Sequence, residues 1–248
     1  MKKYFLTLFL VVSFFFVFGL GVSASESSET EQLREEFESD FLENIEKAQG
    51  EEKNLLLEEY NKYSDLSDSE KNKFVSYIND DELMEIIMEE IPDSEISMNA
   101  FSGKATETVE LHKDIVSEES VEDIPAVVQG ISVMSSGQTR TATYTKNVYI
   151  LGIRTMQTKA SMTYTRTKSG GRITGVKSYD HRITRNFTLN SWTFSGGYSR
   201  YGNTYAYSRS NVSVSLIFKG AWTYADAESE VRVDNKGNAS GYLKGSLF

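Results

Sequence analysis

The chain has 248 residues and a formal net charge of −10, with 36 Asp and Glu against 26 Lys and Arg. It contains no cysteine and two histidines. This composition excludes a disulfide-stapled fold and the usual zinc-site spacings. A chain of this length can bury one sizeable core and still carry an accessory segment.

The N-terminus has the pattern of an export signal. Lys2 and Lys3 precede an apolar run over Tyr4–Leu20, and small residues follow up to Ala24. This pattern predicts a signal peptide over 1–24, cleaved between Ala24 and Ser25, and therefore a secreted, extracellular protein. The run is close to membrane-spanning length, so an uncleaved anchor is the alternative. The short lysine-rich start and the cysteine-free chain are typical of Gram-positive exports.

Residues 25–92 are predicted to form an acidic helical region. Leu33, Phe37, Phe41 and Ile45 recur every four residues, which is the stripe of an amphipathic helix. Further helical runs cover Glu51–Tyr63, the stretch that opens with Ser67 and Glu70 as a capping box, and the stretch from Asn79 to Ile91. This acidic helical region would serve as a pro-segment.

Residues 93–138 are less regular and are interpreted as a connecting region. Thr106–Leu111 is a candidate strand, and the sequence Ser135–Gln138 is typical of an exposed linker. Any domain boundary is therefore expected between Glu118 and Thr139.

Residues 139–248 are predicted to form a β-rich domain. Val212, Val214, Leu216 and Phe218 alternate with polar residues, as in a strand with one buried face. Turn signals separate such runs at Ser169-Gly170-Gly171, Gly196-Gly197 and Asn235-Lys236-Gly237-Asn238. The predicted fold class is α+β, with an acidic N-terminal helical segment followed by an all-β antiparallel sandwich or barrel of eight to ten short strands.

Charge divides the chain sharply. Thr139–Phe248 holds sixteen Lys and Arg against five Asp and Glu, a net charge of +11, whereas Ser25–Gln138 holds eight against thirty-one, a net charge of −23. Such asymmetry predicts that the acidic segment is an intramolecular partner that masks the basic domain. The alternative is an independent helical domain whose acidity aids solubility.

Motifs for catalysis are sparse. His112 and His181 have no metal-ligand spacing, and dinucleotide and phosphate loops are absent, so no metal and no cofactor are predicted. Asp180-His181 could form half of a hydrolytic dyad, against a surface or structural role for the histidine. Glu228 and Glu230 would share a strand face, against a role as solvated edge charges. A non-enzymatic protein is favoured, with a secreted hydrolase of unrecognised site as an alternative.

Aromatic and basic residues gather in one stretch of the β-rich domain. Tyrosine and arginine dominate recognition surfaces, and arginine pairs bidentately with phosphate. We therefore predict that this stretch binds an anionic cell-wall polymer or membrane surface; nucleic acid would satisfy the same charges, but export disfavours it. The alternative is that these are ordinary strand residues, half of them in the core. The predicted binding residues are Trp192, Tyr198, Arg200, Tyr201, Tyr205, Tyr207 and Arg209.

The order of these segments resembles secreted precursors of large, unmodified Gram-positive bacteriocins and related exported β-rich proteins. The match lies in the signal at Met1–Ala24, the acidic helices over Ser28–Ile91 and the basic strand-rich part from Thr139. The resemblance implies an antimicrobial effector that binds the cell envelope. A non-toxic cell-wall or glycan-binding module and a β-pore toxin are the alternatives, since membrane hairpins also use alternating Ser/Thr-rich strands.

Overall fold

A computed structural model describes residues 29–80, 83, 95–99, 103–126, 137–167, 171–187, 191–218 and 221–246. The predicted signal peptide, its cleavage position and nearly all of the helix predicted from Asn79 to Ile91 lie outside the described residues. The chain divides into two compact units, Met1–Ser76 and Tyr77–Phe248.

The N-terminal unit is helical. One helix covers residues 29–47, and it is followed by α2 (Gly50–Ser64) and α3 (Asp68–Ile78). Gly50 adopts a φ of +59°, a conformation that glycine adopts without steric cost, so the chain can turn between the first two helices. The predicted capping box is confirmed: the backbone N–H of Glu70 donates to the Ser67 hydroxyl at 3.3 Å, and the backbone N–H of Ser67 donates to the Glu70 carboxylate at 2.9 Å.

An aromatic cluster holds these helices together. Phe37 lies with its ring centroid 5.6 Å from that of Phe41, 5.2 Å from Tyr63 and 5.3 Å from Phe74. The first two pairs are edge-to-face and the third is tilted, and such ring contacts stabilise the cluster beyond the burial of apolar area. The predicted apolar stripe is therefore the packing face, because Phe41 and Ile45 are buried.

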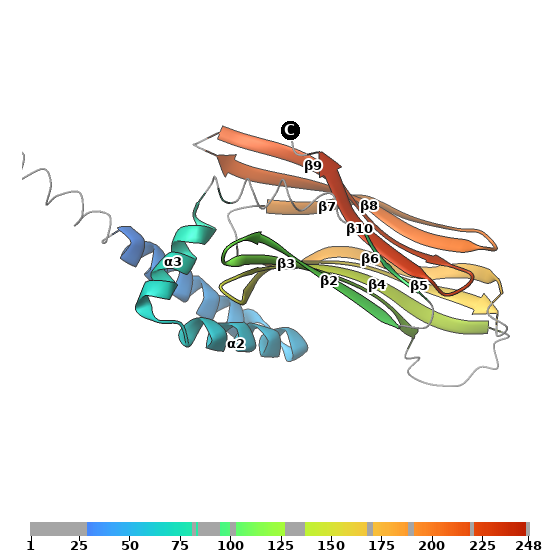
Figure 1. The fold of residues 1–248 in the computed structure, drawn as a ribbon, viewed down its shortest axis with the longest axis horizontal. Helices are drawn as coiled ribbons and strands as arrows, with labels where there is room; N and C mark the ends of the chain where they lie inside the picture. The colour runs from blue at the N-terminus through green and yellow to red at the C-terminus, as the bar shows by residue number, and fades with distance from the viewer. Residues whose placement is uncertain are drawn as a thin grey trace, which may run out of the picture. The chain divides into compact units, whose positions relative to one another are not determined.

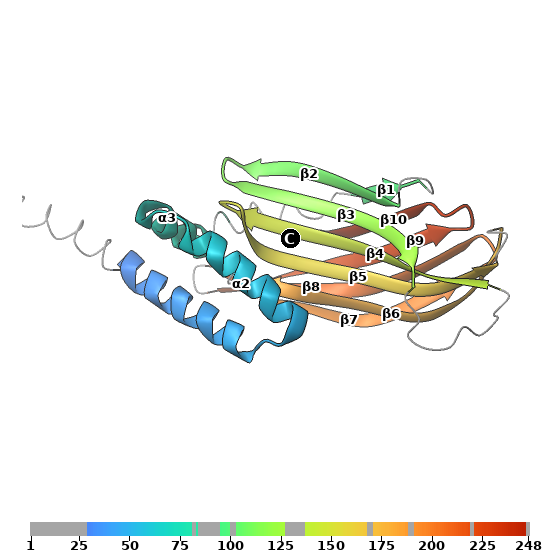
Figure 2. The same ribbon diagram turned by 90° about the horizontal axis from the view of Figure 1, so that it is seen from below.

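The second unit is a sandwich of two antiparallel five-stranded sheets, which lie one over the other in Figure 1. Sheet A has the order β1-β10-β9-β8-β7, and sheet B, seen face-on in Figure 2, has the order β2-β3-β4-β5-β6. The fold class predicted from the sequence is confirmed. The strands are β1 (Glu95–Met98), β2 (Lys104–His112), β3 (Ile115–Pro125), β4 (Gly137–Ile150), β5 (Ile153–Thr167), β6 (Ile173–Asn186), β7 (Ser191–Tyr201), β8 (Tyr205–Phe218), β9 (Ala221–Asp234) and β10 (Ala239–Ser246).

The topology is two meanders joined by two crossings between the sheets. The chain starts in sheet A with β1, crosses to sheet B for β2 to β6, and returns to sheet A for β7 to β10, where β10 pairs with β1. Residues 93–138 thus supply three strands of the sandwich. The change of charge at Thr139 therefore falls inside sheet B, where acidic β2 and β3 lie beside β4 to β6. Taken together, residues 95–248 hold 18 Lys and Arg against 13 Asp and Glu, a net charge of +5.

The turns follow the sequence signals in part. Asn235–Asn238 joins β9 to β10 as predicted. Gly196-Gly197 does not separate two strands as the sequence suggested: Gly196 has a φ of +63° and lies in a bulge inside β7. A further turn at Leu151-Gly152 was not predicted; both residues have positive φ, as a two-residue hairpin requires.

The two sheets fill the interior in different ways. Sheet A contributes mainly valines and small residues, with Ile96, Met98, Trp192 and Leu243 as its larger buried side chains. Val212 and Val214 are buried, as the alternation predicted; the side chains of Leu216 and Phe218 lie outside the described residues. Sheet B contributes large side chains. Gly241 on β10 lies against the Tyr144 ring of β4 so closely that a Cβ at this glycine would be 2.4 Å from the Tyr144 Cβ.

Charged groups of sheet B are buried between the sheets. Glu119 on β3 pairs with Lys146 on β4 at 2.5 Å, and the Tyr144 hydroxyl donates to the same carboxylate at 3.0 Å. Burial lowers the pKa of Lys146 while Glu119 acts to raise it. Nearby, Tyr164 and Arg140 both donate to Asp123, whose pKa is raised because burial outweighs these contacts. Isolated charges would be too costly here, and pairing makes their burial tolerable.

Candidate binding face

Strand alternation brings five of the seven predicted binding residues onto one surface, the outward side of sheet A. We call the surface the tyrosine–arginine face; it comprises Tyr198, Arg200, Tyr205, Tyr207, Arg209 and Arg232. Arg232, on β9, was not predicted, because it lies far along the chain from the aromatic stretch. The sequence did contain a clue: Glu228, Glu230 and Arg232 are spaced two residues apart and therefore lie on the same face of one strand.

The other two predicted residues lie elsewhere. Trp192 is buried, 8% exposed, and pairs with the buried Val214, so it belongs to the core side of β7. Tyr201 is 56% exposed but pairs with the buried Ala206, which places it on the opposite side of the sheet from the tyrosine–arginine face. The alternation along β7 is shifted at the Gly196 bulge, and sequence spacing alone did not reveal this shift.

The strand register sorts the face into cross-strand rows. Arg200, Tyr207 and Arg232 form one row across β7, β8 and β9, so two arginines flank one tyrosine. The next row contains Tyr198 and Arg209, followed by Glu230 on β9. Directly opposed side chains on neighbouring strands are about 5 Å apart, so each row is a contiguous surface.

Rings and guanidinium groups stack within this surface. The Tyr207 ring lies 6.1 Å from both Tyr198 and Tyr205, measured between centroids, and the Tyr205 pair is parallel to within 20°. The Arg232 guanidinium lies 5.6 Å from the Tyr207 centroid, and that of Arg200 lies 5.4 Å from the Tyr198 centroid. These distances are typical of cation–π interactions, which hold the long arginine side chains over the rings.

Arg209 is neutralised within the sheet. It donates to the buried Glu230 carboxylate at 2.9 Å and 2.5 Å and lies 3.1 Å from Glu228. Burial acts to lower the pKa of Arg209, but the hydrogen bonds and charge of Glu230 dominate and raise it. The Tyr242 hydroxyl donates to Glu228 at 2.6 Å. Arg209 therefore contributes to the structure of the face and leaves little charge for a ligand.

Arg200 and Arg232 are different. Both are exposed, and neither makes an ion pair with a carboxylate in the part of the chain that the structure describes. Their guanidinium groups lie over tyrosine rings. These two guanidinium groups are therefore the cations of the face that can pair with an outside anion.

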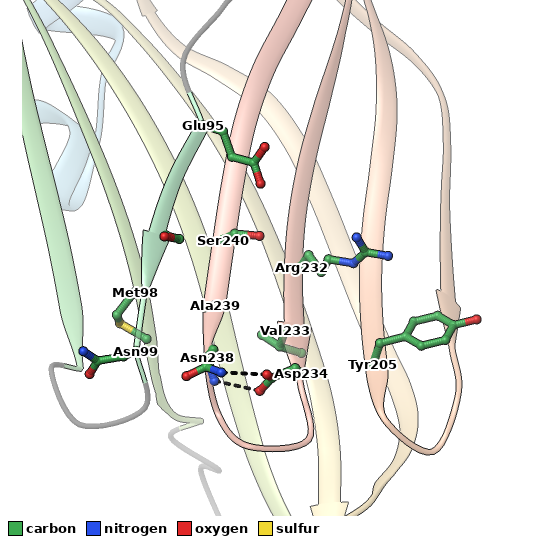
Figure 3. Close-up of a pocket in the computed structure, with 11 residues that line it drawn as sticks. Glu95, Met98, Asn99, Tyr205, Arg232, Val233, Asp234, Asn238, Ala239 and Ser240 are labelled. Atoms are coloured by element: carbon green, nitrogen blue, oxygen red, sulfur yellow. Dashed lines mark hydrogen bonds between the residues drawn. The ribbon is translucent and has the colours of Figure 1, made fainter.

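A depression of about 680 Å³ adjoins the face at its β1 side (Figure 3). Its volume falls within the range of small-ligand sites, roughly 300–1,000 Å³. Tyr205 of β8 and residues 232–234 of β9 form one side of the lining, and β1, β10 and the β9–β10 turn supply the rest. The lining residues are Glu95, Ser97, Met98, Asn99, Tyr205, Arg232, Val233, Asp234, Asn238, Ala239 and Ser240.

The β9–β10 turn forms a rigid rim for this depression. One carboxylate oxygen of Asp234 accepts the backbone N–H groups of Lys236 and Asn238 at 2.8 and 2.9 Å, and the other accepts the Asn238 amide at 2.7 Å. Figure 3 shows both Asn238 contacts. A neighbouring contact, from the backbone N–H of Asn235 to the Thr204 carbonyl, ties this turn to the β7–β8 turn. The rim is fixed by its own hydrogen bonds.

His181 and the pair Glu228 and Glu230, the candidate catalytic groups in the sequence, are engaged by neighbouring side chains of the sandwich. His181 lies between the sheets, with Nε2 2.8 Å from the Ser208 hydroxyl and Nδ1 3.3 Å from that of Ser229. Burial lowers the pKa of His181 to about 4. Ser208 is fully buried, so a substrate cannot reach this pair. The carboxylates of Glu228 and Glu230 are engaged by Arg209.

Among the described residues, no group of three or more His, Cys, Asp and Glu side chains could hold a metal ion. Within the same residues, no helix is both long and apolar enough to cross a membrane. Comparison of the chain with protein-family models, with curated proteins and with solved structures finds no match.

Proposed function

We propose that the protein is a secreted, non-enzymatic, bacteriocin-like effector of a Gram-positive bacterium that binds an anionic polymer of the cell envelope through the tyrosine–arginine face. The observation that carries the proposal is the row in which Arg200 and Arg232 flank Tyr207, both exposed and both without a carboxylate partner among the described residues. Arginine forms bidentate contacts with phosphate and carboxylate groups, which are the charges of such polymers.

Local arrangement, and not total charge, supports the proposal. The sandwich carries a modest charge of +5 over residues 95–248 because β1, β2 and β3 bring carboxylates into it. A diffuse attraction to polyanions would be weak for such a unit. Two unneutralised guanidinium groups on rigid rings lose little side-chain freedom on binding, and this favours a specific contact.

The test is a pull-down of the mature Ser25–Phe248 protein on whole Gram-positive cells and on isolated walls, with and without teichoic acid. We expect retention on teichoic-acid-bearing walls that falls as salt rises, because the contact is electrostatic. The double variant Arg200→Gln/Arg232→Gln should lose most of this retention. The matched control is Lys159→Gln with Arg182→Gln, on sheet B. Retention that is equal for all three proteins would refute the proposal.

We further propose that the acidic helical unit limits access to the face. Its residues 29–76 hold 15 Asp and Glu against 6 Lys and Arg, and an acidic segment on the same chain competes at high effective concentration. Deleting the chain before Thr139 would remove β3, which pairs with β4 over eleven residues, and would disrupt sheet B. Point variants in the helices are therefore the cleaner test. Glu35→Gln, Glu36→Gln and Asp40→Asn together should tighten wall binding in low salt; unchanged binding would leave the helices as an independent module.

A non-toxic glycan-binding module is the second candidate, favoured by the hydroxyl-bearing depression beside the face. The two functions differ in their effect on target cells. A killing assay with the purified mature protein, alongside the double arginine variant, separates them: cell death that depends on both arginines supports the effector, whereas wall binding without death supports the module.

A further inference from the structure

The depression continues the arginine row toward the sheet edge. In the register, Arg232 is opposite Ser240 of β10, and Ser240 is opposite Ser97 of β1. A guanidinium group and two hydroxyl groups thus form one outward line. Tyr205 lies on one side of this line, and the Glu95 carboxylate lies on the other.

The groups in this line are available to a ligand. The hydroxyls of Ser97 and Ser240 and the guanidinium of Arg232 have no hydrogen-bonding side-chain partner within the described part of the chain. Hydroxyls both donate and accept, and Arg232 donates only. Glu95 accepts only; its Oε2 already accepts from Lys244 Nζ at 3.1 Å, so Oε1 is the atom left for a ligand hydroxyl. Such a mixed lining matches a ligand that itself carries hydroxyl groups together with an acid group.

Tyr205 supplies an aromatic surface whose position is fixed. The ring is 40% exposed, is stacked on Tyr207 at 6.1 Å, and has the Arg232 guanidinium 6.0 Å from its centroid. The backbone of Gly202 lies against it, since a Cβ there would be 3.0 Å from ring atom Cε1. An exposed, positioned ring is suited to contact with the apolar face of a sugar ring.

We infer that this depression is the subsite for an acidic glycan, a pyranose that carries a carboxylate or phosphate group. The acid group pairs with Arg232, and one sugar ring contacts Tyr205 on β8. Because β8 and β1 are three strand spacings apart, about 14 Å, the hydroxyls that bond to Ser240, Ser97 and Glu95 belong to the neighbouring sugar units of the same glycan. A dense polyanion without sugar hydroxyls, such as a bare polyphosphate, offers no donor to Glu95 and no ring to Tyr205. This inference rests on the proposed function and specifies the ligand class.

The test measures the dissociation constant of the mature full-length protein by calorimetry with four probes: polygalacturonate, its fully methyl-esterified form, a phosphomannan and inorganic polyphosphate. The ester keeps the sugar and removes the charge, and polyphosphate keeps the charge and removes the sugar. We expect binding to polygalacturonate or to phosphomannan at least about tenfold tighter than to the ester and to polyphosphate, the contribution of one charge-assisted contact. The preferred acidic probe identifies the acid group.

Three variants test the named contacts. Arg232→Gln and Tyr205→Ala should each weaken binding of the acidic glycan about tenfold. Gly202→Ala should weaken it by a smaller factor, because it displaces the Tyr205 ring and removes no ligand contact. The matched control is Lys236→Gln, on the same β9–β10 turn but outside the lining, which should bind as the parent does.

Two results would overturn the inference: polyphosphate binding as tightly as both acidic glycans, or an Arg232→Gln protein that folds and binds acidic glycan like the parent. Neither result touches the proposed function, because wall retention that depends on Arg200 and Arg232 is scored separately. Loss of wall retention in the parent protein, by contrast, would remove the proposed function itself.

Discussion

The two sheets of the sandwich have opposite designs. Sheet A directs small residues such as Ser208, Ser229 and Gly241 inward, whereas the tyrosines and arginines of the tyrosine–arginine face point outward. Sheet B directs Tyr144 and Lys146 inward, and its outward positions on β4 and β5 are largely threonine and serine. Sheet B therefore supplies the largest fully buried side chains of the sandwich, and sheet A presents a chemically diverse outer surface. Period-two alternation makes such a division possible because each strand has two independent faces.

The buried ion pair of sheet B gives the largest predicted effect. Lys146→Met leaves the Glu119 carboxylate buried without its cation and should lower the free energy of unfolding by about 3–5 kcal/mol. Adding Glu119→Gln removes the uncompensated charge and keeps an acceptor for the Tyr144 hydroxyl, so the double variant should recover most of the loss. Urea unfolding followed by circular dichroism measures both. Equal stability of the single variant and the parent would mean that sheet B does not hold charge in the interior.

The histidine between the sheets predicts a pH dependence. His181 has a folded-state pKa of about 4, below its unfolded value of about 6.5. The unfolded chain therefore binds a proton at His181 more readily than the folded chain does. The stability contributed by neutral His181 is fully present above pH 6.5 and is lost as the pH falls toward 4. The total is at most about 3 kcal/mol. The measurement is the free energy of unfolding at several pH values, compared with His181→Gln, which should lack this component. Parallel pH curves for the two proteins would contradict the assignment.

The small-residue interior of sheet A gives a steric prediction. Gly241→Ala places a Cβ against Tyr144 and should cost about 1–3 kcal/mol, the usual cost of overpacking. The control is Gly171→Ala, where a Cβ meets nothing within 4 Å. Thermal melts of the two variants measure the difference. If both melt alike, the close approach of the sheets at Gly241 is not a constraint on packing.

The arginines of the outward face should differ in their effect on stability, because Arg209 is paired with carboxylates and Arg200 is not, within the described residues. Arg209→Gln strips the buried Glu230 carboxylate of its partner and should cost about 1–2 kcal/mol, reduced because Arg209 itself is partly exposed. Arg200→Gln should change stability by less than about 0.5 kcal/mol, as for an exposed surface residue, while it weakens wall binding. Chemical denaturation of both variants checks this order, and the reverse order would show that the cations of the face were misassigned.

Local pattern in the sequence determined much of this protein. Repeats of four along Phe37 and Phe41 fixed the packing stripe of the first helix, and the Ser67–Glu70 spacing fixed a helix start, since both depend on contacts within a few residues. Alternation along Val212 and Val214 identified a buried strand face for the same reason. The concentration of tyrosine and arginine over 198–209 located most of the face.

Only the tertiary structure decided the rest. Which strands share a sheet depends on pairings between distant residues, so local pattern did not place Arg232 beside Tyr207 or the acidic β3 beside β4. The bulge at Gly196 shifted the alternation, so Trp192 lies on the core side although it has the same odd–even parity as Tyr198 and Arg200; Tyr201 lies on the opposite side from Arg200 because the two are adjacent in the strand. The neutralisation of Arg209 by Glu230, and the freedom of Arg200, likewise arise from cross-strand neighbours, because the strand register sets which charges meet.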